Sequence, residues 1–218
     1  MLLPDSESLH HADSAFVPDT ITTKTEFWAH TYSKLDALLD KQQRNWVTNL
    51  SNASSLIYNA LLAFPEHFGS GPRAVNWCGF YLDSQLFPQP TQHRAENGTA
   101  MHTTSNAKSR LLLGPFNGRP ACQYINTAPG RARYGVCADA FLQQRTIVVP
   151  DVEQYPGHIA CDGSTRSEVV CPLIQRCSSE VRVLGVLDLD CLAIGGFGDE
   201  DKVGIENIAE LLVSACDW

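Results

Sequence analysis

The sequence contains no apolar run long enough to cross a membrane, no excess of basic residues and no C-x-x-C motif. Its longest apolar stretches, residues 56–64 and 168–174, are far shorter than the roughly 18 residues that a spanning helix needs. The 16 basic residues are outnumbered by 24 acidic residues, which gives a net charge of -8. A field of that sign does not attract phosphate groups. We therefore expect a soluble protein that binds neither nucleic acid nor a membrane.

The first residues lack the basic and continuously apolar regions of a secretory signal, and they are too acidic for a transit peptide. This pattern predicts a cytoplasmic location, with the nucleus as an additional compartment. Eight cysteines are far too few for a disulfide scaffold of this length. Because no His/Cys cluster has zinc-finger spacing, we expect no metal site. Packing or redox chemistry remains as the role of the cysteines.

The composition is typical of a folded domain, with 44% hydrophobic and 18% charged residues. Residues 1–22 are rich in Ser, Asp, His and Pro and show little periodicity, which indicates a flexible tail. Residues 23–218 then form one domain. Within it, the polar stretch at about 84–109 is too long for an ordinary hairpin loop and is interpreted as a surface insertion.

Hydrophobic periodicity predicts helices and strands in a mixed order. Helices are expected at residues 27–39, 46–61, 135–144 and from 199 onward, and strands at 75–82, 110–113, 121–125, 146–149, 168–174 and 181–189. We expect a turn at 114–118 and a long loop at 151–166. Hairpins combined with terminal helices predict the α+β class, with a central, mostly antiparallel β-sheet flanked by the N- and C-terminal helices.

Acidic side chains occur at two strand positions where they could meet. Asp188 and Asp190 lie on the same face of their strand because side chains alternate with a period of two. Glu168 opens the preceding strand and could lie beside them. Three converging acids would suit a ligand ammonium group or a shared proton. The alternative is a strand end that enters solvent.

Three cysteines stand outside obvious packing positions. Cys161 lies in the long loop, Cys122 begins a strand, and Cys137 is near a helix start, where backbone N–H groups favour the thiolate. Each could also be an ordinary small hydrophobic residue, and the functional reading needs them to meet in space. Trp77 and Tyr81 share one strand face and could form either a pocket wall or a core pair.

Six segments, taken together and in this order, resemble one enzyme family. They are residues 76–82, 113–118, 135–137, 151–162, 167–173 and 185–190. The chain resembles the free methionine-(R)-sulfoxide reductases, which are single GAF-domain enzymes, and its long polar insertion is similar to that of a fungal member. The resemblance implies a GAF fold, a homodimer and a role in oxidative stress. It also implies a reductase of free L-methionine (R)-sulfoxide that uses no cofactor and receives electrons from thioredoxin.

The resemblance also assigns roles to individual residues. Cys161 matches the family's attacking cysteine, which becomes a sulfenic acid, Cys137 matches a resolving cysteine, and Cys122 matches a further cysteine able to form a disulfide. One departure is Ala138, where the family usually has glycine. Another is the lengthened link at residues 128–133. Both departures lie next to the cysteines that are expected to resolve the sulfenic acid.

The remaining matches concern the substrate. Glu168, Asp188 and Asp190 match acids that hold the substrate and help to protonate the sulfoxide oxygen. Trp77 and Tyr81 match aromatic residues that line the pocket. Two alternatives stay open: a non-catalytic GAF module that senses a small ligand, and an inactive family member that acts as a redox-sensitive binding protein. A sensor would need neither the three matching cysteines nor three clustered acids.

Overall fold

A computed structural model describes residues 15–88, 109–158, 162–177 and 180–218. Its centre is a six-stranded sheet in the order β3-β2-β1-β6-β5-β4, and each neighbouring pair of strands is antiparallel. The strands are β1 (Val75–Asp83), β2 (Arg110–Gly118), β3 (Tyr124–Asn126), β4 (Ile147–Val149), β5 (Ser167–Cys177) and β6 (Glu180–Cys191). The predicted α+β class with an antiparallel sheet is confirmed.

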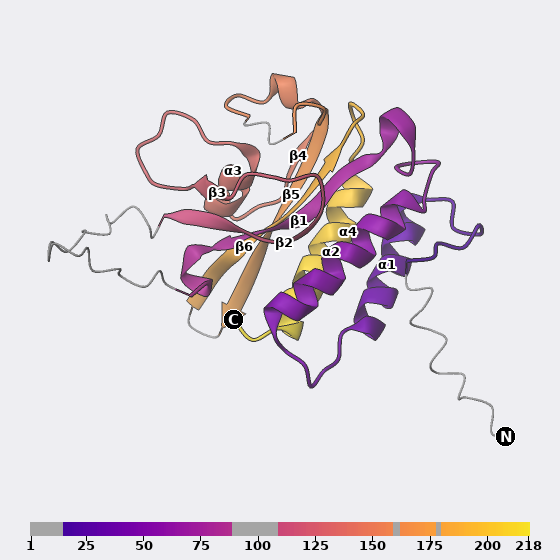
Figure 1. Ribbon diagram of the computed structural model, residues 1–218, viewed down its shortest axis with the longest axis horizontal. Helices are drawn as coiled ribbons and strands as arrows, with labels where there is room; N and C mark the ends of the chain where they lie inside the picture. Colours follow the sequence, from indigo (N-terminus) through magenta and orange to yellow (C-terminus); the bar gives the residue numbers. More distant parts are fainter. Residues whose placement is uncertain (1–14, 89–108, 159–161, 178–179) are drawn as a thin grey trace, which may run out of the picture.

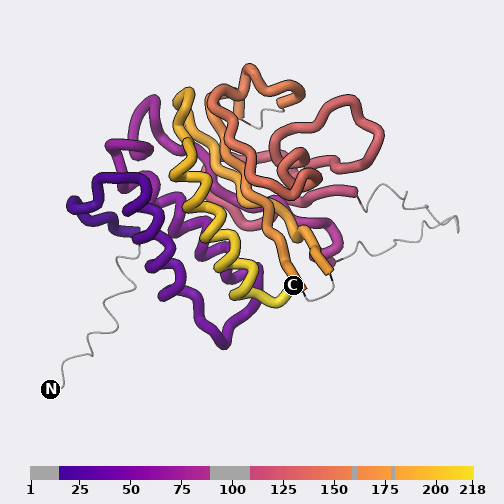
Figure 2. The backbone as a smooth tube through the Cα atoms, turned by 180° about the vertical axis from the view of Figure 1, so that it is seen from behind, coloured from indigo at the N-terminus to yellow at the C-terminus, as the bar shows by residue number. Residues whose placement is uncertain are grey.

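Helices cover the two faces of the sheet unequally (Figure 1, Figure 2). On one face α2 (Trp46–Leu62) and α4 (Asp199–Ala215) contact the strands, and α1 (Lys24–Leu38) packs against both of these helices. The opposite face carries the short helix α3 (Val136–Gln143) and the loops around it. None of the helices in the described ranges combines the length and apolarity that crossing a membrane requires.

The N-terminal part of the domain is held by polar contacts at helix starts. A capping box begins α1, in which the Thr23 side chain and the Glu26 carboxylate accept each other's backbone N–H groups. Asp201, in the first turn of α4, is fully buried and accepts hydrogen bonds from Lys24 at 2.6 Å and from Trp28 Nε1 at 2.9 Å. This buried carboxylate therefore joins α1 to α4.

The structure describes only parts of the predicted N-terminal tail and of the predicted insertion. Residues 1–14 of the predicted tail lie outside the described residues, whereas residues 15–22 lie against the domain, with Val17 only 7% exposed. The predicted insertion falls almost entirely outside the described residues. Its first residues form a short 3-10 turn at Ser84–Leu86.

Alternation along the central strands builds two separate cores. From β1, the side chains of Cys78, Phe80 and Leu82 pack under α2 and α4, while Trp77 and Tyr81 pack on the α3 face. β5 and β6 follow the same rule because strand side chains alternate between faces. The α3 face therefore receives apolar side chains from the sheet centre together with the acids of β5 and β6.

The predicted turn at residues 114–118 is wrong, because this segment is the second half of β2. Pro115 misled the prediction, since proline is rare inside sheets. The structure accommodates it at an irregularity of the β1–β2 register, between Gly79 and Tyr81 of β1. The β2–β3 ladder joins only Arg110–Leu112 to β3, so no ladder N–H is needed at Pro115 on that side.

Gly79 allows two aromatic rings to lie over β1. A Cβ atom at this position would lie 2.6 Å from a ring carbon of Trp77 and would also overlap Phe116. We predict that Gly79→Ala lowers the free energy of unfolding by about 1–3 kcal/mol, since overpacking must displace the rings. Urea unfolding followed by tryptophan fluorescence measures this change.

Gly163→Ala is the matched control, because a Cβ atom at Gly163 meets nothing within 4 Å. Its effect on the free energy of unfolding should stay within about 0.5 kcal/mol. Equal stabilities of the two variants would contradict the packing argument.

Candidate active site

The register of three strands gathers the predicted acids on one face of the sheet. Trp77 of β1 pairs with Asp190 of β6, and Asp190 pairs in turn with Glu168 of β5. One step along the sheet, Asp188 pairs with Gly79 and so lies on the same face. Residues more than a hundred positions apart in the sequence, Trp77 and Asp190, are therefore neighbours in one row across the sheet.

A cavity of about 540 Å³ opens over this row, between the sheet, the start of α3 and the loops after β2 and β4. Seven of the eight predicted site residues line it: Trp77, Tyr81, Cys122, Cys137, Glu168, Asp188 and Asp190. The eighth, Cys161, lies outside the described residues. The structure thus brings Cys122, Cys137 and the three acids to the lining of one cavity, and the predicted meeting of all three cysteines stays a prediction.

Aromatic rings form one wall of the cavity. The rings of Trp77 and Tyr81 stack with centroids 5.8 Å apart, and the ring of Phe116 also stacks on that of Trp77, with centroids 5.7 Å apart. The Tyr81 hydroxyl donates to the backbone carbonyl of Cys122 at 3.0 Å. Because this contact connects β1 to the segment before β3, the wall also positions Cys122.

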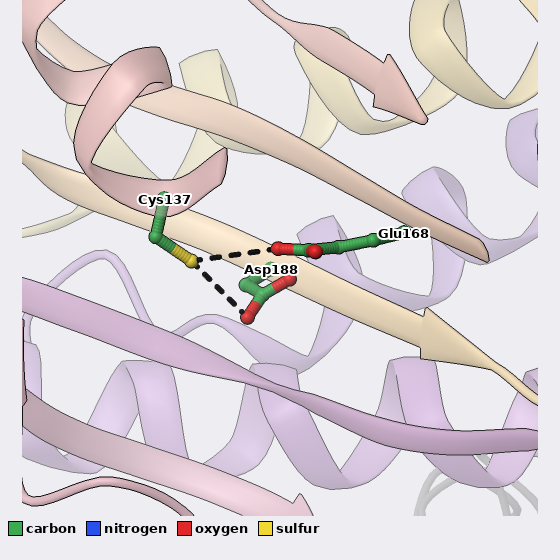
Figure 3. Close-up of side chains that lie close together, drawn as sticks. All are labelled: Cys137, Glu168 and Asp188. Atoms are coloured by element: carbon green, nitrogen blue, oxygen red, sulfur yellow. Dashed lines mark hydrogen bonds between the residues drawn. The ribbon is translucent and has the colours of Figure 1, made fainter. Parts of the chain in front are cut away.

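Cys137 lies at the start of α3 and points into the acid cluster (Figure 3). Its sulfur is 3.3 Å from Asp188 Oδ2 and 3.7 Å from Glu168 Oε1, so the thiol can donate its proton to either carboxylate. The Cys137 residue is only 7% exposed. Helix α3 therefore places the buried thiol of Cys137 in contact with two buried carboxyl groups.

The expectation that the helix start favours the Cys137 thiolate is wrong. Burial raises the pKa of the Cys137 thiol well above its ordinary value, and the negative charges of Asp188 and Glu168 raise it further. The backbone N–H groups of an eight-residue helix do not outweigh burial beside two carboxylates. In the absence of a cation, this cysteine is a protonated thiol.

The acids themselves are also perturbed. Burial raises the pKa of Asp188 well above its ordinary value, and the charges of Glu168 and Asp190 add to the effect. The pKa of Asp190 is raised by the same kind of cause, against a lowering contribution from a hydrogen bond with Thr165. Oδ1 of Asp188 is buried and has no hydrogen-bond partner among the described residues. The cluster therefore has a deficit of positive charge.

Several cavity residues were not assigned a role from the sequence. His158 places Nε2 3.4 Å from Glu168 Oε2. Asn76 lines the cavity beside Trp77 because the β1–β6 register shifts between Val75 and Trp77, which interrupts strict alternation. A bulge leaves no signal in the hydrophobic pattern. The sequence motif around His158 was recognised, but its loop position gave no indication of a partner.

A second polar network holds the loop that follows β4. Asn76 donates to Asp162 at 3.2 Å and to Thr165 at 3.0 Å, and Arg119 pairs with Asp162 at 3.1 Å. Hydrogen bonds from Ser164, with the charge of Arg119 and the Asn76 contact, lower the pKa of Asp162. The loop is thus fixed to β1 and to the residues after β2, at the rim of the cavity.

Because the pKa of Asp188 is raised in the folded state, the free energy of unfolding should fall as the pH rises. An aspartate that holds its proton more tightly in the folded state destabilises the fold as the pH rises from about 4, the unfolded value, towards the folded value. We predict that Asp188→Asn raises the free energy of unfolding at pH 7 by about 1–3 kcal/mol, since the amide, unlike the buried carboxyl group, need neither take up a proton on folding nor be buried as a charge. Its advantage over the wild type should shrink towards pH 4 in urea unfolding.

Asp162→Asn is the control of opposite sign. In the wild type, the lowered pKa of Asp162 contributes stability above about pH 4. This stability is lost as the pH falls through the pKa that Asp162 has in the folded state. This variant should therefore be less stable than the wild type at pH 7 and should approach it in acid. Destabilisation by Asp188→Asn at pH 7 would contradict the electrostatic description of the cluster.

Comparisons with known proteins show which proteins the chain resembles in sequence and in fold. No family model matches the chain. A free methionine-R-sulfoxide reductase of Saccharomyces cerevisiae is 38% identical over 211 residues, which cover 97% of each chain. A solved structure described as a GAF domain matches with a TM-score of 0.74 at 36% identity, covering 98% of this chain and 100% of the other.

A further solved structure, free methionine-R-sulfoxide reductase from Neisseria meningitidis in complex with its substrate, matches with a TM-score of 0.65 at 28% identity. That match covers 92% of both chains. The predicted GAF fold is confirmed by these likenesses. With 38% identity to a reductase along almost the whole chain, the protein belongs to the free methionine-R-sulfoxide reductase family.

Proposed function

We propose that the protein reduces free L-methionine (R)-sulfoxide to methionine, with thioredoxin as the electron donor and without a bound cofactor. The observation that carries the proposal is the single cavity that is lined by Cys122, Cys137, three carboxyl groups and an aromatic wall. Its volume of about 540 Å³ is within the usual range for small-molecule sites. The relatives named as reductases of this substrate support the same assignment.

The acid cluster accounts for a preference for the free amino acid. The ammonium group of the substrate would supply the positive charge that Glu168, Asp188 and Asp190 lack. In a peptide that nitrogen is an uncharged amide, so the buried carboxylates would remain uncompensated at a large energetic cost. Trp77 and Tyr81 would pack against the methyl and methylene groups of the substrate.

The first chemical step uses the family's attacking cysteine, Cys161. Its thiolate attacks the sulfoxide sulfur, the oxygen accepts a proton from an acid of the cluster, and methionine leaves while Cys161 retains the oxygen as a sulfenic acid. An aspartic acid with a raised pKa, such as Asp188, is suited to donate that proton near neutral pH.

The second step removes the sulfenic acid. The thiol of Cys137 or Cys122 attacks the sulfur of Cys161, water leaves, and a disulfide forms that the two thiols of thioredoxin then reduce. Cys137 already lies in the cavity as a protonated thiol, and Glu168 or Asp188 can accept its proton. The protein is further proposed to be a homodimer that acts in the cytoplasm, and additionally in the nucleus, during oxidative stress.

The carboxylate of the substrate needs a cationic partner, and Arg131 is suited to this role. It lies in the lengthened link between Cys122 and Cys137 and lines the cavity. Arg119, the other arginine of the cavity lining, is already paired with Asp162. A guanidinium group matches the planar geometry of a carboxylate. The departure from the family's usual loop length thus brings a charge to the cavity mouth.

Turnover is tested by NADPH consumption with thioredoxin and thioredoxin reductase. Free methionine (R)-sulfoxide, its (S) epimer and N-acetyl methionine (R)-sulfoxide are supplied in parallel. We predict turnover on the free (R) form alone, and for Cys161→Ser a rate below about one thousandth of the wild-type rate, since the nucleophile is lost.

The outcome separates this proposal from its rivals. Activity that persists in Cys161→Ser would reassign the nucleophile to another cysteine. A folded, reduced protein with no turnover on any of the three compounds would contradict the reductase assignment. It would favour a GAF module that binds a small ligand.

The role of Arg131 is tested with a substrate that lacks the carboxylate. We predict that Arg131→Gln raises KM for free methionine (R)-sulfoxide about tenfold with little change in kcat, because a uniform binding contact is lost. KM for methionine (R)-sulfoxide amide should stay unchanged. Arg133→Gln is the matched control, since Arg133 is exposed in the same loop and is not among the cavity-lining residues. Equal effects on acid and amide would contradict the assignment.

A further inference from the structure

We propose that the reduced protein binds one zinc ion through Cys137, Glu168 and Asp188, and that this ion blocks the cavity until it is removed. The metal would be a reversible inhibitor and not a resident cofactor. Oxidation of Cys137 to a disulfide removes the thiolate ligand, so the oxidised protein would not bind the ion. Zinc would therefore hold the protein in its reduced state.

The three side chains have the spacing of a zinc site. One potential ligand atom from each lies within 4.8 Å of the other two. The Cys137 sulfur is 3.3 Å from the Asp188 oxygen and 3.7 Å from the Glu168 oxygen. With Zn–S near 2.3 Å and Zn–O near 2.0 Å, tetrahedral geometry requires a sulfur-to-oxygen separation of about 3.5 Å. The observed distances bracket this value, so the ligands need only small movements.

The surroundings complete the site. The second oxygen of Glu168 lies 3.4 Å from Nε2 of His158, and such an outer contact typically orients a metal-bound carboxylate. The three ligands line the cavity, which leaves a fourth position open for water. Three protein ligands and one open position are a common arrangement for zinc.

The charge of the cluster favours a cation. Among the described residues no lysine or arginine forms an ion pair with Glu168, Asp188 or Asp190, and the His158 contact with Glu168 is ionic only when the imidazole is protonated. Asp188 is 5% exposed, and its Oδ1 has no hydrogen-bond partner in the described part of the chain. Asp188 therefore offers a metal ion one oxygen, Oδ2, beside the Cys137 thiol, and a second buried oxygen, Oδ1, that has no partner within the described ranges.

The ligand set also selects the metal. Thiolates bind zinc much better than they bind magnesium or calcium, which prefer sites made only of oxygen atoms. Zinc and the ammonium group of methionine sulfoxide would meet the same demand for positive charge, so they should compete. The competition rests on the proposed function, whereas the binding of zinc does not.

Binding is tested on the reduced, metal-free full chain by competition with a chromogenic zinc chelator, and by the absorption spectrum with cobalt(II) in place of zinc. We expect one equivalent of zinc and a thiolate-to-cobalt charge-transfer band, with no response to magnesium. Cys137→Ser should lose the band, and both Cys137→Ser and Glu168→Gln should bind zinc at least about tenfold more weakly. Cys177→Ser is the matched control, since Cys177 is exposed, and should bind as the wild type does.

A measurement without substitutions guards against a variant that fails to fold. The wild type oxidised until Cys137 lies in a disulfide, as peptide mass mapping verifies, should lose the cobalt band and regain it after reduction. Failure of the reduced wild type to bind zinc, or equal binding by Cys137→Ser, would overturn the proposal. A cobalt band that persists in the oxidised protein would also overturn it.

Inhibition is measured separately, as methionine formed in a single turnover by reduced protein without external thiol. Zinc should suppress methionine formation, and both a chelator and a higher sulfoxide concentration should restore it. Zinc binding without any methionine formation in the metal-free protein would reject the proposed function and leave the metal site intact. Methionine formation that is insensitive to bound zinc would overturn the blocking role.

Discussion

The carboxyl groups of Glu168, Asp188 and Asp190 crowd onto one face of the sheet without a lysine or arginine ion pair in the described part of the chain. Such a concentration of buried negative charge is costly, because like charges and loss of solvent both disfavour ionisation. The raised pKa values of Asp188 and Asp190 are its direct expression. A ligand that brings positive charge would relieve the cost, and the cavity above the acids gives it access.

The rest of the fold supports this cluster. The core beneath α2 and α4 packs against β1, β6 and β5, while residues of the opposite core, around α3, line the cavity. Ties from Asn76 and Arg119 to Asp162 fix the following loop at the rim. The larger of the two hydrophobic cores lies on the helix-covered face of the sheet, and the acid cluster lies on the other face.

The protonation of the Cys137 thiol also depends on the charge of the acid cluster. Beside two carboxylates it remains protonated, and a cation in the cavity would lower that barrier to ionisation. The proposed substrate supplies an ammonium group, whereas zinc supplies a doubly charged ion with affinity for sulfur. The substrate and zinc would then both supply positive charge to the acid cluster. The substrate leaves the Cys137 thiol free to react, whereas zinc binds its sulfur.

The sequence by itself determined most elements and the facing of Asp188, Asp190, Trp77 and Tyr81, because strand alternation is a local property of the chain. It failed at Pro115, where a strand irregularity resembles a turn. Only the tertiary structure decided that Glu168 pairs with Asp190 and that the Cys137 thiol stays protonated. Strand register and burial arise from segments distant in sequence, and they set an electrostatic environment that no local pattern records.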